Sequence, residues 1–131
     1  MSFTALLSCS RVALAVPASV CGMVARVVPA RTLPLSPAPL DPAQVVSGQP
    51  VVSADEVVTV GAVTVGVWEH TAGISTDVEA DEVFVVLTGR ATVEVEGGAV
   101  LELAPGDIGV LQAGDRTRWT VHETLRKVYI V

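Results

Sequence analysis

Alternating hydrophobic and polar residues mark the last two thirds of the chain. Valines alternate with other residues across 62–71, and small apolar residues alternate with charged or polar neighbours across 91–95. Because side chains on one face of a strand recur at every second position, this period predicts strands with one buried face. If the valines of 62–71 face inward, Glu69 faces inward with them.

Further strands are predicted where apolar runs lie between turn residues. The nearly continuous apolar run 82–87 ends at Gly89, as a strand buried on both faces would. Gly97-Gly98 is a two-residue hairpin signal, and residues 105–107 and 113–115 have turn composition. The other expected strands are 57–60, 100–103, 108–111, 117–122 and 125–131. Short strands between turns, with no helical period, predict an all-β sandwich or small barrel.

Composition agrees with this class. About one residue in five is valine, and half of the chain is hydrophobic. Valine packs well on a pleated surface, so the apolar content favours strands over helices. A length of 131 residues suits one domain of ordinary size and is too short for two separate cores.

Charge divides the chain into two parts. Residues 1–40 carry three arginines and no acid, whereas residues 41–131 carry all 14 acids and five bases, which gives +3 and −9. Residues 29–42 contain five prolines and are expected to form an extended linker. We therefore expect a poorly ordered extension with a Pro-rich linker at 1–39 and a folded domain at 40–131. The extension is also compatible with a secretory signal peptide, with an organellar transit peptide, or with a start codon assigned too far upstream.

The acidic balance also limits the partners. A net charge of −6 and a pI near 4.7 repel phosphate backbones and anionic headgroups, so we expect neither nucleic acid nor membrane as a partner. Both cysteines, Cys9 and Cys21, lie in the basic stretch, which leaves the acidic part without a thiol for catalysis or zinc binding. A cytoplasmic protein is expected.

Two segments carry a family resemblance. Residues 73–89, GISTDVEADEVFVVLTG, together with the turns at 105–107 and 112–114, resemble the two signature motifs of the cupin superfamily. In the first motif Glu82 and Gly89 keep the interval between the motif glutamate and glycine, and Glu79 and Asp81 stand roughly where the histidines belong. In the second motif the two glycines fit, and its other positions are replaced: Gln112 for proline, Thr117 for histidine and Val121 for asparagine.

The resemblance narrows at residues 118–129 and 66–69, which are similar to the small single-domain cupins grouped with the ureidoglycine aminohydrolase cupin domain and the ethanolamine-utilisation cupins. It covers about residues 40–131. It implies a cupin double-stranded β-helix, a jelly-roll barrel that commonly forms homodimers and has a pocket between its sheets. Members of this group often lack the metal-binding histidines.

The residues at the motif positions do not favour a metal-binding site. A cupin metal centre needs imidazole ligands, and three of its four ligands are absent here. Glu79 and Asp81 with Glu82 could at best bind a hard ion such as Mg²⁺. His70 and His122 occupy the opposite parity from the inferred pocket and are expected on the surface. We therefore expect no metal and no cofactor.

The candidate ligand-binding residues come from the inward positions. Glu69 and Glu82 both occupy positions expected to face inward. Two carboxylates that share an apolar cavity raise the pKa of at least one of them, which is how a general acid or base is made. The alternative is that each carboxylate is neutralised by Lys127, Arg126 or Arg118, or is hydrogen-bonded to the backbone at a corner of the sheet. Trp119 forms either a pocket wall or plain core. The candidate pocket consists of Glu69, Glu79, Asp81, Glu82, Phe84, Thr117 and Trp119.

The sequence thus predicts a metal-free cupin that binds a small molecule of unassigned identity. The alternative is a cupin enzyme, aminohydrolase-like or isomerase-like, that acts on a small polar metabolite through a carboxylate or a weakly held divalent metal. A third interpretation is an interaction module whose sheet faces serve only to form a dimer.

Overall fold

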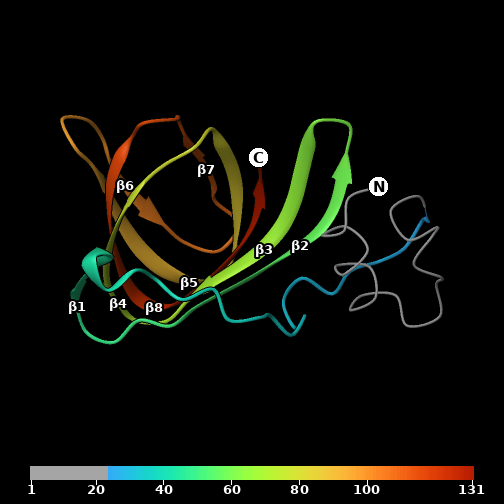
Figure 1. The fold of residues 1–131 in the computed structure, drawn as a ribbon, viewed down its shortest axis with the longest axis horizontal. Coiled ribbons are helices and arrows are strands. Elements are labelled where there is room, and N and C mark those ends of the chain that lie inside the picture. Colours follow the sequence, from blue (N-terminus) through green and yellow to red (C-terminus); the bar gives the residue numbers. More distant parts are fainter. Residues whose placement is uncertain (1–23) are drawn as a thin grey trace.

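The structure, a computed structural model, describes residues 24–131, and the cysteines and the rest of the expected extension at 1–23 lie outside the described residues. The described chain forms one antiparallel sheet that curls into a barrel, which confirms the expected all-β jelly roll (Figure 1). A short 3-10 turn, η2 (Pro42–Gln44), precedes the sheet. The strands are β1 (Val45–Ser47), β2 (Val52–Val60), β3 (Val63–His70), β4 (Gly73–Val78), β5 (Glu82–Val95), β6 (Val100–Leu103), β7 (Ile108–Leu111) and β8 (Arg116–Ile130).

Strand β8 is the centre of the sheet. Along one side it pairs with β5, and along the other it pairs first with β4 and then with β3. Strand β2 extends the sheet beyond β3, whereas β6 and β7 both pair with β5. The hairpin of β2 and β3 reaches past the barrel, as Figure 1 shows. Because β8 contacts three other strands, its inward side chains meet residues from several parts of the sequence.

The two longest strands were each expected as two shorter ones. Strand β5 continues through Gly89, and its register with β8 shifts near that residue. Gly89 has φ of +88°, and a Cβ there would collide with the carbonyl of Thr124. The glycine therefore marks a bulge at a close backbone approach, although its sequence context suggested the end of a strand.

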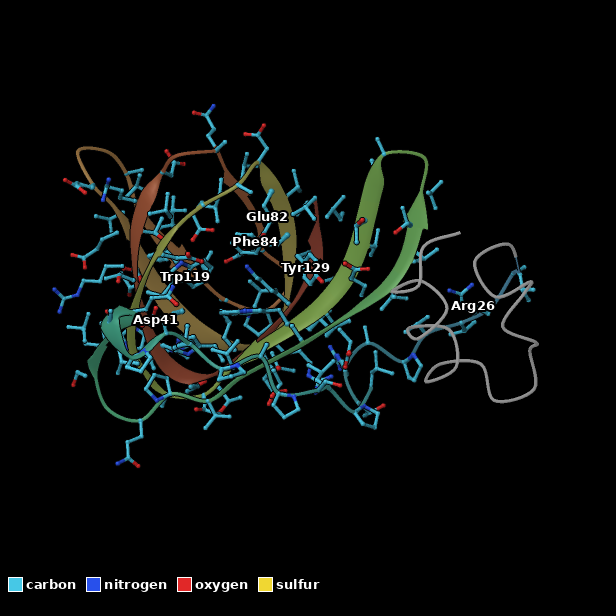
Figure 2. All side chains as sticks on the ribbon, viewed as in Figure 1. Arg26, Asp41, Glu82, Phe84, Trp119 and Tyr129 are labelled. Atoms are coloured by element: carbon cyan, nitrogen blue, oxygen red, sulfur yellow. The ribbon has the colours of Figure 1, made fainter. Side chains whose placement is uncertain are left out.

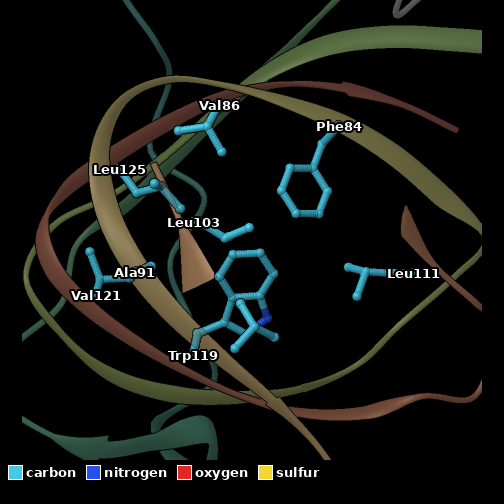
Figure 3. Close-up of a cluster of buried hydrophobic side chains, with 9 residues drawn as sticks. Phe84, Val86, Ala91, Leu103, Leu111, Trp119, Val121 and Leu125 are labelled. Carbon is cyan, nitrogen blue, oxygen red and sulfur yellow. The ribbon is translucent and has the colours of Figure 1, made fainter. Parts of the chain in front are cut away.

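The main hydrophobic core lies inside the curl of the sheet. Figure 3 shows side chains from β5, β6, β7 and β8 meeting there. Its buried members are Phe84, Val86, Ala91, Val93, Leu103, Leu111, Trp119, Val121 and Leu125. The inward parity expected for Thr117 and Trp119 agrees with their exposures of 3% and 4%.

A second core lies on the outer face of β2 and β3, where residues 24–39 cover the sheet. We call these residues the N-terminal strap. Leu33 is only 4% exposed and packs with Val57 and Val67. The strap also pairs with β2 through backbone hydrogen bonds from Ala38 to Val52 and from Ala54 to Ser36. The expectation of a linker outside the folded domain is therefore wrong for the described part of this segment.

The strap explains a wrong prediction of parity on β3. Val67 lies in the outer core, while Trp68 contacts the inner core and His70 is 1% exposed. Both faces of β3 are thus covered, and alternating valines identify a buried face without showing which side of the sheet it is. Glu69 consequently lies on the outer face, where it pairs with Arg126.

None of the helical structure within residues 24–131 has the length and apolar character required to cross a bilayer.

We predict that Leu33→Ala destabilises the domain by about 2–5 kcal/mol, because it opens a cavity between the strap and the sheet. Val27, which is 88% exposed in the same strap, supplies the control, and Val27→Ala is expected to change the free energy of unfolding by less than about 0.5 kcal/mol. Urea denaturation of the full chain measures both changes. Equal stabilities of the two variants would contradict a structural role for the strap.

Candidate functional site

The barrel interior contains a cavity of about 240 Å³ beside the hydrophobic core, with which it shares Trp119. Its walls combine aromatic rings with charged and polar groups from β3, β4, β5 and β8, and β2 contributes Ala54. The lining residues are Leu40, Ala54, Trp68, Ser75, Thr76, Asp77, Glu79, Glu82, Trp119, Lys127, Tyr129 and Val131. In Figure 2 the labelled Glu82, Trp119 and Tyr129 gather within the curl of the sheet.

An ion pair between Lys127 and Glu82 dominates the cavity. The Lys127 Nζ donates to the Glu82 Oε2 at 2.6 Å, and the two side chains are 5% and 14% exposed. Lys127 lies on β8 with the same parity as Leu125 and Tyr129, so its side chain enters the barrel. Glu82 is the first residue of β5, which pairs with β8 at this end of the barrel.

Three aromatic rings surround the same ammonium group. The Lys127 Nζ lies 4.5 Å from the ring centroids of Trp68 and Phe84 and 4.7 Å from that of Trp119. Each ring presents a negative face to the cation, and such contacts are worth about 2 kcal/mol when they are desolvated. The carboxylate and the rings together compensate the loss of hydration of a buried charge.

Glu79 binds neutral donors at the side of this cage. Its Oε1 accepts hydrogen bonds from the Thr117 Oγ1 at 2.8 Å and from the Trp119 Nε1 at 3.1 Å. The Trp119 Nε1 also lies 3.2 Å from the Thr117 Oγ1. These bonds fix the indole of Trp119 between Glu79 and the ammonium of Lys127. The sequence placed Glu79, Thr117 and Trp119 in one pocket; the structure brings the three into contact, with Glu79 and Trp119 lining the cavity and Thr117 behind them, outside its lining.

His70 is buried, which corrects the expectation of a surface position. Its Nδ1 lies 2.6 Å from the carbonyl of Thr71, and its Nε2 lies 2.9 Å from the Ser75 Oγ. Burial lowers its pKa below 6.5, the charge of Lys127 lowers it further, and the hydrogen bond to the Thr71 carbonyl opposes both. Burial therefore favours the neutral imidazole of His70, which contacts the cavity residue Ser75 from behind the lining. His122 is exposed, with its Nε2 2.9 Å from the Thr92 Oγ1.

Tyr129 closes the other side of the cavity. Its ring crosses Gly66 of β3 so closely that a Cβ at that glycine would collide with it. Burial raises the pKa of Tyr129 to about 12, with further contributions from the carboxylates of Glu56, Glu82 and Asp55. The phenol hence remains a neutral hydrogen-bonding group at any physiological pH.

The remaining candidate residues do not line the cavity. Glu69 accepts a 2.7 Å hydrogen bond from the Arg126 Nε on the outer face, so it shares no pocket with Glu82. Asp81 is exposed and caps the turn before β8 by accepting from the backbone N–H of Ala113 at 2.8 Å. Phe84 is fully buried beneath Lys127. The structure thus contains the alternative that the sequence left open: Arg126 neutralises Glu69, and Lys127 neutralises Glu82.

Sequence reasoning missed Trp68, Ser75 and Tyr129 as cavity residues and treated Lys127 only as a neutralising partner. A signal for Lys127 was present, because it is the only lysine in the chain and alternates with Leu125 and Tyr129. For Trp68 no such signal existed, since the valines of the same strand suggested the opposite parity.

A cupin metal ion does not fit the residues of this cavity. Within the described part of the chain, no three His, Cys, Asp or Glu side chains converge as metal ligands. Asp81 points to a backbone amide, and the carboxylate of Glu82 is already bound by an ammonium group. A divalent cation on Glu82 would face the positive charge of Lys127 at close range.

A curled antiparallel sheet that surrounds a cavity defines a small jelly-roll barrel. The model of the EutQ-like cupin domain matches residues 57–129, more than half of the chain, and the chain belongs to this family. A search of curated proteins finds no match.

Solved structures agree with this assignment. A protein of unknown function from Rhizobium leguminosarum bv. viciae is 26% identical, with a TM-score of 0.56 over 60% of this chain and 78% of that one. A DUF861-family protein of unknown function from Pseudomonas syringae pv. tomato is 26% identical, with a TM-score of 0.66 over 76% of this chain and 45% of that one. The EutQ protein of Clostridium difficile is 15% identical, with a TM-score of 0.61 over 79% of this chain and 83% of that one, and shares the fold.

We predict that Glu82→Gln lowers the free energy of unfolding by about 3–5 kcal/mol, because the buried ammonium of Lys127 loses its counter-charge. Lys127→Met should also destabilise, since it leaves the carboxylate without its cation. The double variant removes both charges and is expected to be more stable than Glu82→Gln. Denaturant melts of all four proteins give the coupling energy. Additive effects of the two substitutions would contradict a direct pair.

The single tyrosine of the chain permits a direct titration. We predict that phenolate absorbance of the folded protein rises with a midpoint near pH 12, whereas the urea-unfolded chain titrates near pH 10. Because the unfolded state releases this proton first, the Tyr129 contribution to stability is constant below pH 10 and decreases as the pH rises toward 12. A midpoint near 10 in the folded protein would contradict the burial of Tyr129.

Proposed function

We propose that the chain is a small-molecule-binding cupin whose ligand occupies the cavity between Trp68, Trp119 and Tyr129, and that it binds this ligand without a resident metal. The observation that carries the proposal is the neutralisation of Glu82 by Lys127 inside the cavity. The cupin fold commonly holds a metal near this glutamate, and here the chain supplies its own cation.

The cavity has the composition of a small-ligand site. Aromatic side chains supply apolar walls, and Ser75, Thr76 and Glu79 supply polar groups that can orient a ligand. Its volume of about 240 Å³ lies below the ~300–1,000 Å³ range that is typical of drug-sized ligands, so a small metabolite is the proposed occupant. The indole of Trp119 is fixed by its hydrogen bonds, which limits the entropy lost on binding.

We predict that the protein purified without added metal contains no stoichiometric Mn, Fe, Ni or Zn, and that a metabolite library contains compounds that raise its melting temperature. A ligand at 100 times its Kd stabilises by about 2.7 kcal/mol. Ala54→Leu adds bulk to the cavity wall and should weaken each such shift, whereas Ala62→Leu makes the same change in the exposed turn between β2 and β3 and should not.

These measurements separate the competing functions. Stoichiometric transition metal would contradict metal-free binding and favour a metal-dependent cupin enzyme. A library without any stabilising compound would contradict ligand binding and favour an interaction module. Equal shifts in the two alanine variants would place the ligand outside this cavity.

A further inference from the structure

The charges that line the cavity are unbalanced. Three carboxylates, those of Asp77, Glu79 and Glu82, line the cavity together with one ammonium, that of Lys127, and of the three only Asp77 is exposed. Among residues 24–131, the ion pair of Lys127 is with Glu82, and neither Asp77 nor Glu79 forms an ion pair. The protein partners of these two carboxylates are neutral: Thr117 and Trp119 for Glu79, and the backbone N–H of Val78 for Asp77.

The cavity already surrounds one alkylammonium group of the chain itself, the side chain of Lys127. Lys127 consists of a methylene chain that ends in an ammonium, and its Nζ lies within 4.7 Å of three ring centroids. Aromatic walls with nearby carboxylates are the surroundings that proteins use to bind ammonium ligands. This environment stabilises a cation at one carboxylate of the cavity and leaves two further carboxylates without one.

An anionic ligand is disfavoured by the same charges. The lining carries a formal charge of −2 when the three carboxylates and one ammonium are counted, and the whole chain carries −6. The charges of the partly buried Glu79 and Glu82 are screened less than charges on an open surface, whereas the exposed Asp77 adds a weaker, solvent-screened repulsion. The single ammonium that an anion could approach is 5% exposed and is already occupied by Glu82.

From this imbalance we infer that the ligand of the cavity is a small organic cation, an alkylammonium compound whose charged group lies against Glu79 and Asp77 and whose carbon chain contacts Trp119 and Tyr129. The inference rests on the proposed function and specifies its ligand class. Lys127 keeps Glu82 neutralised, so the second cation meets the two carboxylates that remain unpaired.

The chain provides its own optical probe for this inference. Both of its tryptophans, Trp68 and Trp119, and its single tyrosine line the cavity, so its intrinsic fluorescence reports on that space. We would titrate the full chain at neutral pH and constant ionic strength with propylammonium, propionate and propionamide. The three probes have similar size and differ in charge.

Propylammonium is expected to change the tryptophan emission saturably, with a Kd at least about tenfold lower than that of either other probe. Glu79→Gln retains an oxygen that can accept from Thr117 and Trp119 but removes the charge, and should weaken propylammonium binding by about tenfold. Glu123→Gln makes the same change in net charge at an exposed position of β8 outside the cavity and should leave the Kd unchanged. Melting temperatures of both variants verify folding.

Three results would overturn the inference. Tighter binding of propionate or propionamide would exclude the cationic class and still support small-molecule binding in the cavity. If Glu79→Gln and Glu123→Gln changed the Kd of propylammonium equally, the preference for a cation would come from the overall charge of the protein and not from the cavity. Silence of all three probes would reject an alkylammonium ligand, while the metabolite library tests the proposed function separately.

Discussion

The buried ammonium of Lys127 is the constraint around which the barrel interior is arranged. A lone charge in a protein interior is costly, so it must be paired or stabilised by the groups around it. Glu82 supplies the opposite charge from β5, and Trp68, Phe84 and Trp119 supply ring faces from β3, β5 and β8. The side chain of Lys127 thus connects β3, β5 and β8 at the edge of the core. The cavity lies beside this cluster and takes its chemistry from it.

Strand β8 transmits this organisation to both faces of the sheet. Arg126 and Lys127 are adjacent and therefore point to opposite sides of the strand. Arg126 binds Glu69 and the carbonyls of Ala30 and Leu33 in the strap, while Lys127 binds Glu82 in the cavity. The outer pair fixes the strap and the inner pair fixes the cavity wall. The N-terminal strap and the candidate site are consequently parts of one folded unit.

Much of the fold could be predicted from the sequence, because alternation and turn residues report local strand geometry. Alternation also gave the inward parity of Thr117 and Trp119, since the outer face of β8 at this point carries polar residues. It failed for Glu69, because the strap buries the outer face of β3 and makes both faces apolar. The same error misplaced His70, which shares the inner face of β3 with Trp68 and has hydrogen-bond partners for both ring nitrogens in Thr71 and Ser75. The pairing of Lys127 with Glu82 needed the long-range register of β5 and β8.

The ammonium of Lys127 lies inside an aromatic cage against Glu82, and NMR can test this placement directly. Because Lys127 is the only lysine, protein labelled with ¹³C,¹⁵N-lysine gives one set of lysine side-chain NMR signals. We predict that its ε-methylene protons are shifted upfield by the ring currents of Trp68, Phe84 and Trp119, and that its ammonium protons exchange slowly with water. Random-coil shifts with fast exchange would show that Lys127 lies in solvent and has no aromatic cage.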